Sequence, residues 1–105
     1  MERDVEKRLN KGVADRGGKS FKWVSPGNAG VPDRIVIVPP GRVVFVELKE
    51  VGGRLSAQQK AQIRRLRLMG CDVRVLVGGH EVDVFLNELD YMAGEEVMPY
   101  EVHST

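Results

Sequence analysis

The chain has 105 residues and a formal net charge of +1, and its single cysteine, Cys71, excludes an intramolecular disulfide. This length is typical of one compact domain, and 42% hydrophobic with 30% charged residues is ordinary for a soluble globular protein. No apolar run reaches the roughly 18 residues that a membrane span needs, and the charged N-terminus does not resemble a secretory signal. We therefore expect a cytoplasmic protein, and any argument for a nucleic-acid partner must depend on where the charges lie.

The first third of the chain predicts a helix, a short strand and a loop. Apolar residues recur every four positions from residue 5 to residue 13, which predicts an amphipathic helix over residues 2–16. Alternation of apolar and polar residues over 21–23 predicts a short strand. The serine, proline, glycine and asparagine content of residues 25–30 is typical of a loop.

Residues 34–49 predict a β-hairpin. Two apolar runs of strand length, 34–38 and 43–49, are separated by a Pro-Pro-Gly turn at 39–41. Because residues 43–46 are apolar at successive positions, we expect the sheet to be covered on both faces.

A second helix, a strand and a last helix follow. Ser56, with Gln59 three residues later, forms a capping-box pattern that predicts a helix start, and this helix extends to about Met69. Residues 71–77 predict a strand, and a final helix follows the Gly-Gly-His turn after it.

The predicted fold class is α/β, with the element order α-β-β-β-α-β-α. We expect a single domain over residues 1–93 and a C-terminal tail over 94–105. The tail has no clear apolar period, so it is predicted to be disordered or to contact a dimer partner.

Three charged residues are predicted to meet at one end of the hairpin. Glu47 and Lys49 are two positions apart on a strand, so they point to the same side. Folding the hairpin about its turn brings Asp33 level with residues 47–49. Two carboxylates this close repel each other unless a cation lies between them, and oxygen ligands suit Mg²⁺ or Mn²⁺. The alternative is a surface ion pair between Glu47 and Lys49, which contributes little to stability.

Two short segments around these charged residues resemble the signature of a known family. Residues 30–33 (Gly-Val-Pro-Asp) and 46–49 (Val-Glu-Leu-Lys) resemble the G-x-P-D … E-x-K signature of the PD-(D/E)xK nuclease superfamily. More narrowly, they resemble the VRR-NUC family, whose small stand-alone members are common in phage and bacterial genomes. The resemblance covers about residues 2–90. It implies a restriction-endonuclease-like core, in which helices flank a mixed central sheet.

The resemblance also implies roles for individual residues. Asp33 and Glu47 would ligate Mg²⁺ or Mn²⁺ with the backbone carbonyl of Leu48, and Lys49 would position the attacking water. Glu6 resembles the first-helix glutamate that reaches the metal, directly or through water, in many members, with Glu2 as the alternative. A solvated helix residue is the other interpretation of Glu6.

Gln59 has two possible roles. It resembles the helix glutamine that the family places beside the catalytic lysine. A capping-box glutamine, however, needs no catalytic role. The two interpretations are compatible only if its side chain turns toward the site.

A basic stripe is predicted on the helix after the catalytic strand, with further polar residues in the hairpin and loops. Such patches bind phosphates without sequence preference, although a solvated helix face is the alternative. The candidate DNA-binding residues are Lys22, Ser25, Arg34, Arg54, Lys60, Arg64 and Arg67.

The sequence therefore predicts a metal-dependent DNA endonuclease of a bacterial cell or phage-infected host. From the resemblance we expect a homodimer that is selective for branched DNA such as Holliday junctions. The candidate dimer surface comprises Phe85, Leu89, Met92, Val97, Met98 and Tyr100. The alternative is that Phe85 and Leu89 are core residues and that the tail is disordered. A non-cleaving DNA-binding module of the same fold is the alternative function, and a protein-interaction domain is a third.

Overall fold

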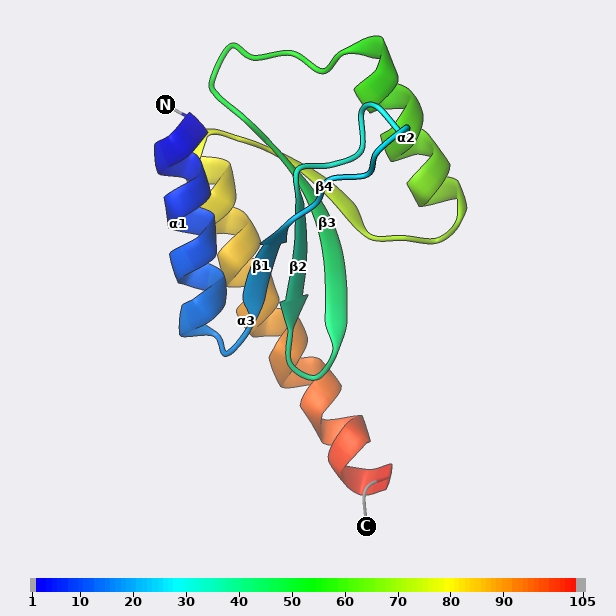
Figure 1. Cartoon of the computed structure of the whole chain (residues 1–105). Coiled ribbons are helices and arrows are strands. Elements are labelled where there is room, and N and C mark those ends of the chain that lie inside the picture. Colours follow the sequence, from blue (N-terminus) through cyan, green and yellow to red (C-terminus); the bar gives the residue numbers. More distant parts are fainter. Residues whose placement is uncertain (1, 104–105) are drawn as a thin grey trace.

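A computed structural model describes the backbone of residues 2–103 and the side chains of residues 3–91. Its elements are α1 (Glu2–Asp15), β1 (Lys19–Lys22), β2 (Arg34–Val38), β3 (Arg42–Lys49), α2 (Ala57–Leu68), β4 (Val73–Val77) and α3 (Gly78–His103). The predicted element order is confirmed (Figure 1). No helix in the described part of the chain is both long and apolar enough to cross a membrane.

The four strands form one mixed sheet in the order β1-β2-β3-β4. The β1–β2 and β2–β3 pairs are antiparallel, whereas β3 and β4 are parallel. A parallel pair needs a crossover connection, and α2 lies in that connection. In the β2–β3 hairpin Arg34 is opposite Val46. Asp33, one residue before Arg34, is therefore level with Glu47, as the sequence predicts.

Helices α1 and α3 pack side by side on one face of the sheet (Figure 1). Alternate strand residues point into this layer and bury their side chains against the two helices. The core comprises Val5, Leu9, Val13, Val36, Val38, Val44, Val46, Leu48, Leu76, Val82, Phe85, Leu86 and Leu89. Gly12 permits the close approach of the helices, because a β-carbon there would overlap the side chain of Leu86.

Burial of two residues of α3 corrects the predicted dimer surface. Phe85 is 1% exposed and Leu89 is 2% exposed, so both belong to the core of the subunit. They pack against the sheet and are not available to a partner. The other predicted residues of this surface, Met92, Val97, Met98 and Tyr100, lie outside the side chains that the structure describes.

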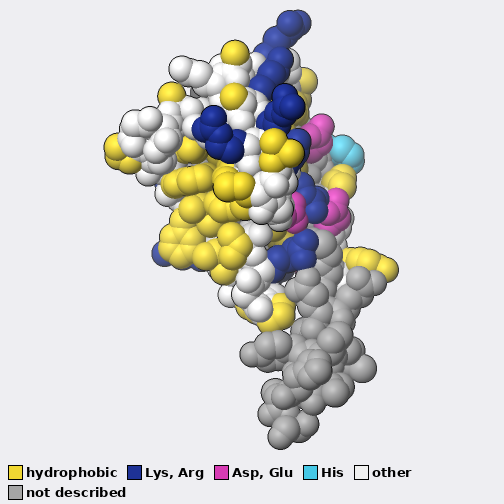
Figure 2. All heavy atoms as spheres, turned by 90° about the vertical axis from the view of Figure 1, so that its right-hand side faces the viewer, with side chains coloured by type: hydrophobic (Ala, Val, Ile, Leu, Met, Phe, Trp, Pro, Cys, Tyr) yellow, Lys and Arg dark blue, Asp and Glu magenta, His cyan; other side chains and the backbone are white. Residues whose placement is uncertain are grey.

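The opposite face of the sheet is only partly covered, whereas the sequence predicts cover on both sides. The short helix α2 lies over one end of this face, where it buries Ile63 to 4% exposure. Beyond its reach Phe21, Ile37 and Val43 remain 38–43% exposed. Figure 2 shows apolar side chains gathered on this side of the molecule. Apolar residues on both faces of a strand thus did not ensure that a second layer covers its whole length.

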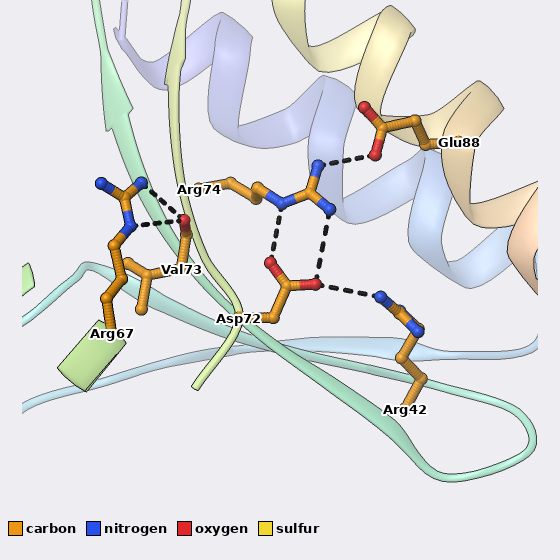
Figure 3. Close-up of polar contacts among 6 residues, drawn as sticks. All are labelled: Arg42, Arg67, Asp72, Val73, Arg74 and Glu88. Carbon is orange, nitrogen blue, oxygen red and sulfur yellow. Dashed lines mark hydrogen bonds and ion pairs between the residues drawn. The ribbon is translucent and has the colours of Figure 1, made fainter. Parts of the chain in front are cut away.

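Asp72 joins three elements in a charged network (Figure 3). Its carboxylate accepts hydrogen bonds from Arg42 at 3.0 Å and from Arg74 at 2.7 Å. Arg74 also donates to Glu88 of α3 at 2.6 Å. The network therefore holds the starts of β3 and β4 against α3. Glu47 and Lys49 lie at the opposite end of β3.

We expect Asp72→Asn to destabilise the fold by about 1–2 kcal/mol, because two partly buried guanidinium groups lose a charged acceptor. Chemical denaturation would measure the change. Asp83→Asn is a matched control, since Asp83 also pairs with an arginine, Arg8, but the side chains are 45% and 57% exposed. Exposed pairs contribute little. Equal losses for the two variants would contradict a special role for the network.

Candidate active site

Three charged residues converge where β2 begins and β3 ends. Glu47 and Lys49 point to the same face of β3, and Nζ of Lys49 lies 3.4 Å from Oε2 of Glu47. Asp33 precedes β2, and its Oδ2 accepts a hydrogen bond of 3.1 Å from the backbone N–H of Leu48. The hairpin register produces this arrangement, so the sequence could predict it.

Glu47 is a buried carboxylate with one unpartnered oxygen. Its side chain is 1% exposed, and Oε2 accepts a hydrogen bond of 3.0 Å from Gln59. Oε1 has no hydrogen-bond partner among the described residues. Burial, followed by the charge of Asp33, raises the pKa of Glu47 to about 7, and the nearby ammonium of Lys49 and the backbone of Asp33 only partly oppose this shift.

These features fit a bound divalent cation. An unpartnered buried oxygen is costly, and a second carboxylate beside it adds repulsion, but a cation bound by both would relieve each effect. Within the described residues no group of three or more His, Cys, Asp or Glu side chains could hold a metal. Mg²⁺ often uses only one or two carboxylates and completes its shell with waters and substrate phosphates. Asp33 and Glu47 therefore suit Mg²⁺ or Mn²⁺ better than Zn²⁺.

Gln59 completes the capping box and also contacts Glu47, so its two interpretations are compatible, and its catalytic role stays a prediction. In the capping box, its backbone N–H donates to Ser56 Oγ at 3.1 Å, and its Oε1 accepts from the backbone N–H of Ser56 at 2.9 Å. The amide nitrogen Nε2 of the same side chain donates to Glu47. The capping box thus orients the amide so that its donor end faces the carboxylate.

Glu6 lies near the site but outside the carboxylate pair. Its Oε1 accepts a hydrogen bond of 3.1 Å from Arg34. Glu6 and Asp33 both line a pocket of about 460 Å³ at the N-terminal end of α1. The full lining comprises Arg3, Glu6, Lys7, Lys22, Trp23, Asp33, Arg34 and Leu48. Metal ligation by Glu6 remains a prediction, and the side chain of the alternative, Glu2, is outside the described set.

Arg34 differs from its predicted role on a DNA-binding surface. It is only 7% exposed, and its guanidinium donates to Ser20, Glu6 and Asn10. With its donors occupied inside the subunit, the side chain fastens α1 to β1. We therefore remove Arg34 from the predicted DNA contacts.

The other candidate DNA contacts are more accessible. Lys60 and Arg64 are exposed on α2, Arg54 is exposed in the preceding loop, and Lys22 is exposed at the pocket. Arg67 is also exposed, although its guanidinium donates to the carbonyl of Val73 at 2.8 Å (Figure 3).

One further candidate contact and two overlooked residues complete the surroundings. Oγ of Ser25 accepts a hydrogen bond of 3.0 Å from Asn28 within the loop.

The residues predicted from the sequence did not include Arg3 and Lys7, which line the pocket. Their spacing of four residues on the first helix, on either side of Glu6, was the available signal.

Comparison with known proteins identifies the family of this chain. The VRR-NUC domain model matches residues 7–79. A protein of Acyrthosiphon pisum secondary endosymbiont phage 1, named "Putative nuclease p44", is 43% identical over 75 residues, which are 71% of this chain and 81% of that protein.

Two solved structures share the fold. One, described as a VRR_NUC domain, is 30% identical with a TM-score of 0.77, and the match covers 82% of this chain and 94% of that one. The other, a VRR_NUC domain protein, is 18% identical with a TM-score of 0.64 and coverage of 83% and 85%, and it supports the fold alone. The family model matches most of the described chain, and the 43% and 30% identical relatives agree with it. This protein therefore belongs to the VRR-NUC domain family.

Proposed function

We propose that this protein is a DNA endonuclease that hydrolyses phosphodiester bonds with the help of Mg²⁺ or Mn²⁺. The observation that carries the proposal is the unpartnered, buried Oε1 of Glu47 beside the carboxylate of Asp33. Burying a carboxylate without a partner is unfavourable for the fold. A functional role for the Glu47 carboxylate is the simplest explanation of why the protein has one there. Family membership and the relative named as a nuclease support the same activity.

Each residue of the site has a defined role in this proposal. Asp33 and Glu47 would hold the ion together with the carbonyl of Leu48. The bound ion would neutralise charge on the phosphate and acidify water. Lys49, 3.4 Å from Glu47, would orient the attacking water and stabilise charge that develops on the phosphate. Gln59 would hold Glu47 so that Oε1 faces the ion.

The charges around the site would bind the DNA backbone. The pocket beside Asp33 carries three exposed basic side chains, which are those of Arg3, Lys7 and Lys22. The exposed residues Lys60 and Arg64 add positive charge on α2, the helix whose Gln59 contacts Glu47. Contacts of this type position a duplex and make its binding depend on salt.

We expect Lys60→Gln/Arg64→Gln to weaken DNA binding and to lower the salt dependence by roughly one to two units of slope, since each lost phosphate contact removes ~0.9. Arg67 is left in place because its guanidinium supports Val73. Fluorescence anisotropy at several salt concentrations would measure the slope. The control, Arg8→Gln/Lys11→Gln, removes the same charge from α1. An equal effect of the two variants would show that net charge, and not this surface, controls binding.

We further propose that the enzyme acts as a homodimer on branched DNA such as Holliday junctions. Two active sites related by a two-fold axis are the simplest way to cut two strands at matched positions. Cleavage of a panel of duplex, flap and four-way junction DNAs by the purified protein tests the activity and the preference together. Equal rates on linear duplex and on junctions would exclude the preference.

Light scattering at micromolar concentration tests the assembly, and we expect the mass of a dimer. Phe85 and Leu89 are buried, so only the other residues of the predicted dimer surface are left to test. A variant that lacks residues 91–105 tests whether they are needed for the dimer. A monomer mass for the full-length protein, both free and on junction DNA, would contradict the homodimer.

A non-cleaving DNA-binding module remains the alternative. Such a module would need the basic surface but not an unpartnered buried carboxylate. A protein that binds the DNA panel but leaves every substrate intact with Mg²⁺ and Mn²⁺ would favour this alternative.

A further inference from the structure

Gly30, the glycine of the G-x-P-D segment, lies directly against the first turn of α2. Its φ is +92°, in the left-handed region that favours glycine. A β-carbon on Gly30 would lie 2.6 Å from the carbonyl carbon and oxygen of Gln58 and 2.8 Å from the backbone nitrogen of Gln59. These are backbone atoms of a helix, which cannot turn aside as the end of a side chain can. A side chain at position 30 would therefore push the start of α2 away from the loop.

The start of α2 carries the residue that holds Glu47. The side-chain amide of Gln59 is bound at both ends, because Oε1 accepts from the N–H of Ser56 at 2.9 Å and Nε2 donates to Glu47 at 3.0 Å. A shift of the helix start would carry Ser56 and Gln59 together and would lengthen the bond from Nε2 to Glu47 of β3. The space at Gly30 is thus linked to the orientation of the buried carboxylate.

Ser56 fixes the same turn from the other side. Its hydroxyl oxygen accepts a hydrogen bond from the backbone N–H of Gln59 at 3.1 Å, so the capping box holds the backbone that Gly30 contacts. The loop and the cap therefore act on one residue, Gln59. Neither Gly30 nor Ser56 donates or accepts a hydrogen bond with Asp33, Glu47 or Lys49 in the described structure.

We propose that Gly30 is a positioning residue that acts through α2. The absence of a β-carbon seats the helix close enough for Gln59 to bind Oε2 of Glu47, which leaves Oε1 of that carboxylate to face the ion. The catalytic consequence rests on the proposed function, whereas the seating of Gln59 does not. A direct contact between the Gly30 backbone and a DNA phosphate is a different role that needs no link to Gln59.

Gly27 provides a matched control in the same loop. Its φ is +80°, but a β-carbon there would meet no atom within 4 Å. Gly27→Ala and Gly30→Ala therefore impose similar backbone strain, and only Gly30→Ala clashes with α2. The difference between the two variants isolates the seating of the helix from the strain of the loop.

The first measurement needs no cleavage. The side-chain amide signal of Gln59 in a ¹H–¹⁵N spectrum of the metal-free protein, identified by its loss in Gln59→Ala, reports the hydrogen bond to Glu47. We expect this signal to keep its position in Gly27→Ala and to move toward that of a solvated amide in Gly30→Ala. An unchanged signal in a folded Gly30→Ala protein would overturn the proposal.

The second measurement is a double-mutant cycle on single-turnover cleavage of junction DNA with Mg²⁺. We expect Gly30→Ala to slow cleavage at least about tenfold with little change in DNA affinity, since small misplacements of active-site groups are costly. Gly30→Ala should add no further loss in the Gln59→Ala background, because both changes remove the same interaction. The same loss in both backgrounds would refute action through Gln59 and would support a phosphate contact.

A second pair of variants keeps the proposal testable if Gly30→Ala does not fold. Ser56→Ala removes the cap oxygen, whereas Ser56→Asp supplies another good N-cap. We expect the amide signal and the rate to change in Ser56→Ala and to be restored in Ser56→Asp. No change in either variant would overturn the link between this turn and Gln59. If the wild-type protein cleaves no substrate, the proposed function fails, and the amide signal alone decides the inference.

Discussion

Glu47→Gln is expected to slow DNA cleavage by at least about 100-fold, a loss of several kcal/mol of transition-state stabilisation. The substitution keeps the volume of the side chain and leaves Gln59 an oxygen to bind. It removes the negative charge from a side chain whose buried Oε1 lacks a hydrogen-bond partner among the described residues. Single-turnover kinetics would measure the loss, and DNA affinity should change much less.

The same variant should make the metal-free protein more stable at pH 8. Glu47 has a usual pKa of 4.5 that rises to about 7 in the folded protein. Between these values the folded protein binds a proton that the unfolded chain does not, so the contribution of Glu47 to stability is fully present below pH 4.5 and is lost as the pH rises through 7. The loss is at most about 3.5 kcal/mol, since the shift spans about 2.5 pKa units and one unit corresponds to ~1.4 kcal/mol. Glu47→Gln removes this loss.

Asp33→Ala and Lys49→Ala provide the comparison for catalysis. Each should also cut the rate by at least about 100-fold while DNA binding persists. Asp72→Asn is the control, because its network lies apart from the carboxylate pair and should affect stability alone. Normal cleavage by Lys49→Ala would contradict the role assigned to that lysine, and an equal pH dependence of stability in wild type and Glu47→Gln would contradict the buried charge.

Removal of divalent cations with excess chelator is expected to abolish cleavage, and Mg²⁺ or Mn²⁺ should restore it. Ca²⁺ should support DNA binding but little turnover, because its looser and longer coordination fits the chemistry poorly. Cleavage that continues unchanged in excess chelator would exclude the metal mechanism.

A stability measurement tests the same ion without activity. A cation and a proton compete for Glu47, whose pKa is about 7. Mn²⁺ should therefore raise Tm more at pH 8 than at pH 6, where part of the population carries a proton that must first leave. Glu47→Gln should show little increase at either pH. A similar increase in the variant would place the bound ion elsewhere.

The sequence by itself determined the elements and the meeting of Asp33, Glu47 and Lys49. These features depend on short-range rules, because helix and strand periods set which residues share a face and the hairpin turn sets the register. The cap at Ser56 could be predicted for the same reason, since its two hydrogen bonds lie within one turn of helix.

Only the tertiary structure decided how distant segments meet. It buried Arg34 against Glu6, placed Phe85 and Leu89 in the core, and left part of one sheet face uncovered. It also placed Gly30 against the turn of α2 that carries Gln59. Each of these outcomes depends on how closely whole elements pack, and that distance is set by the sum of side-chain volumes between them.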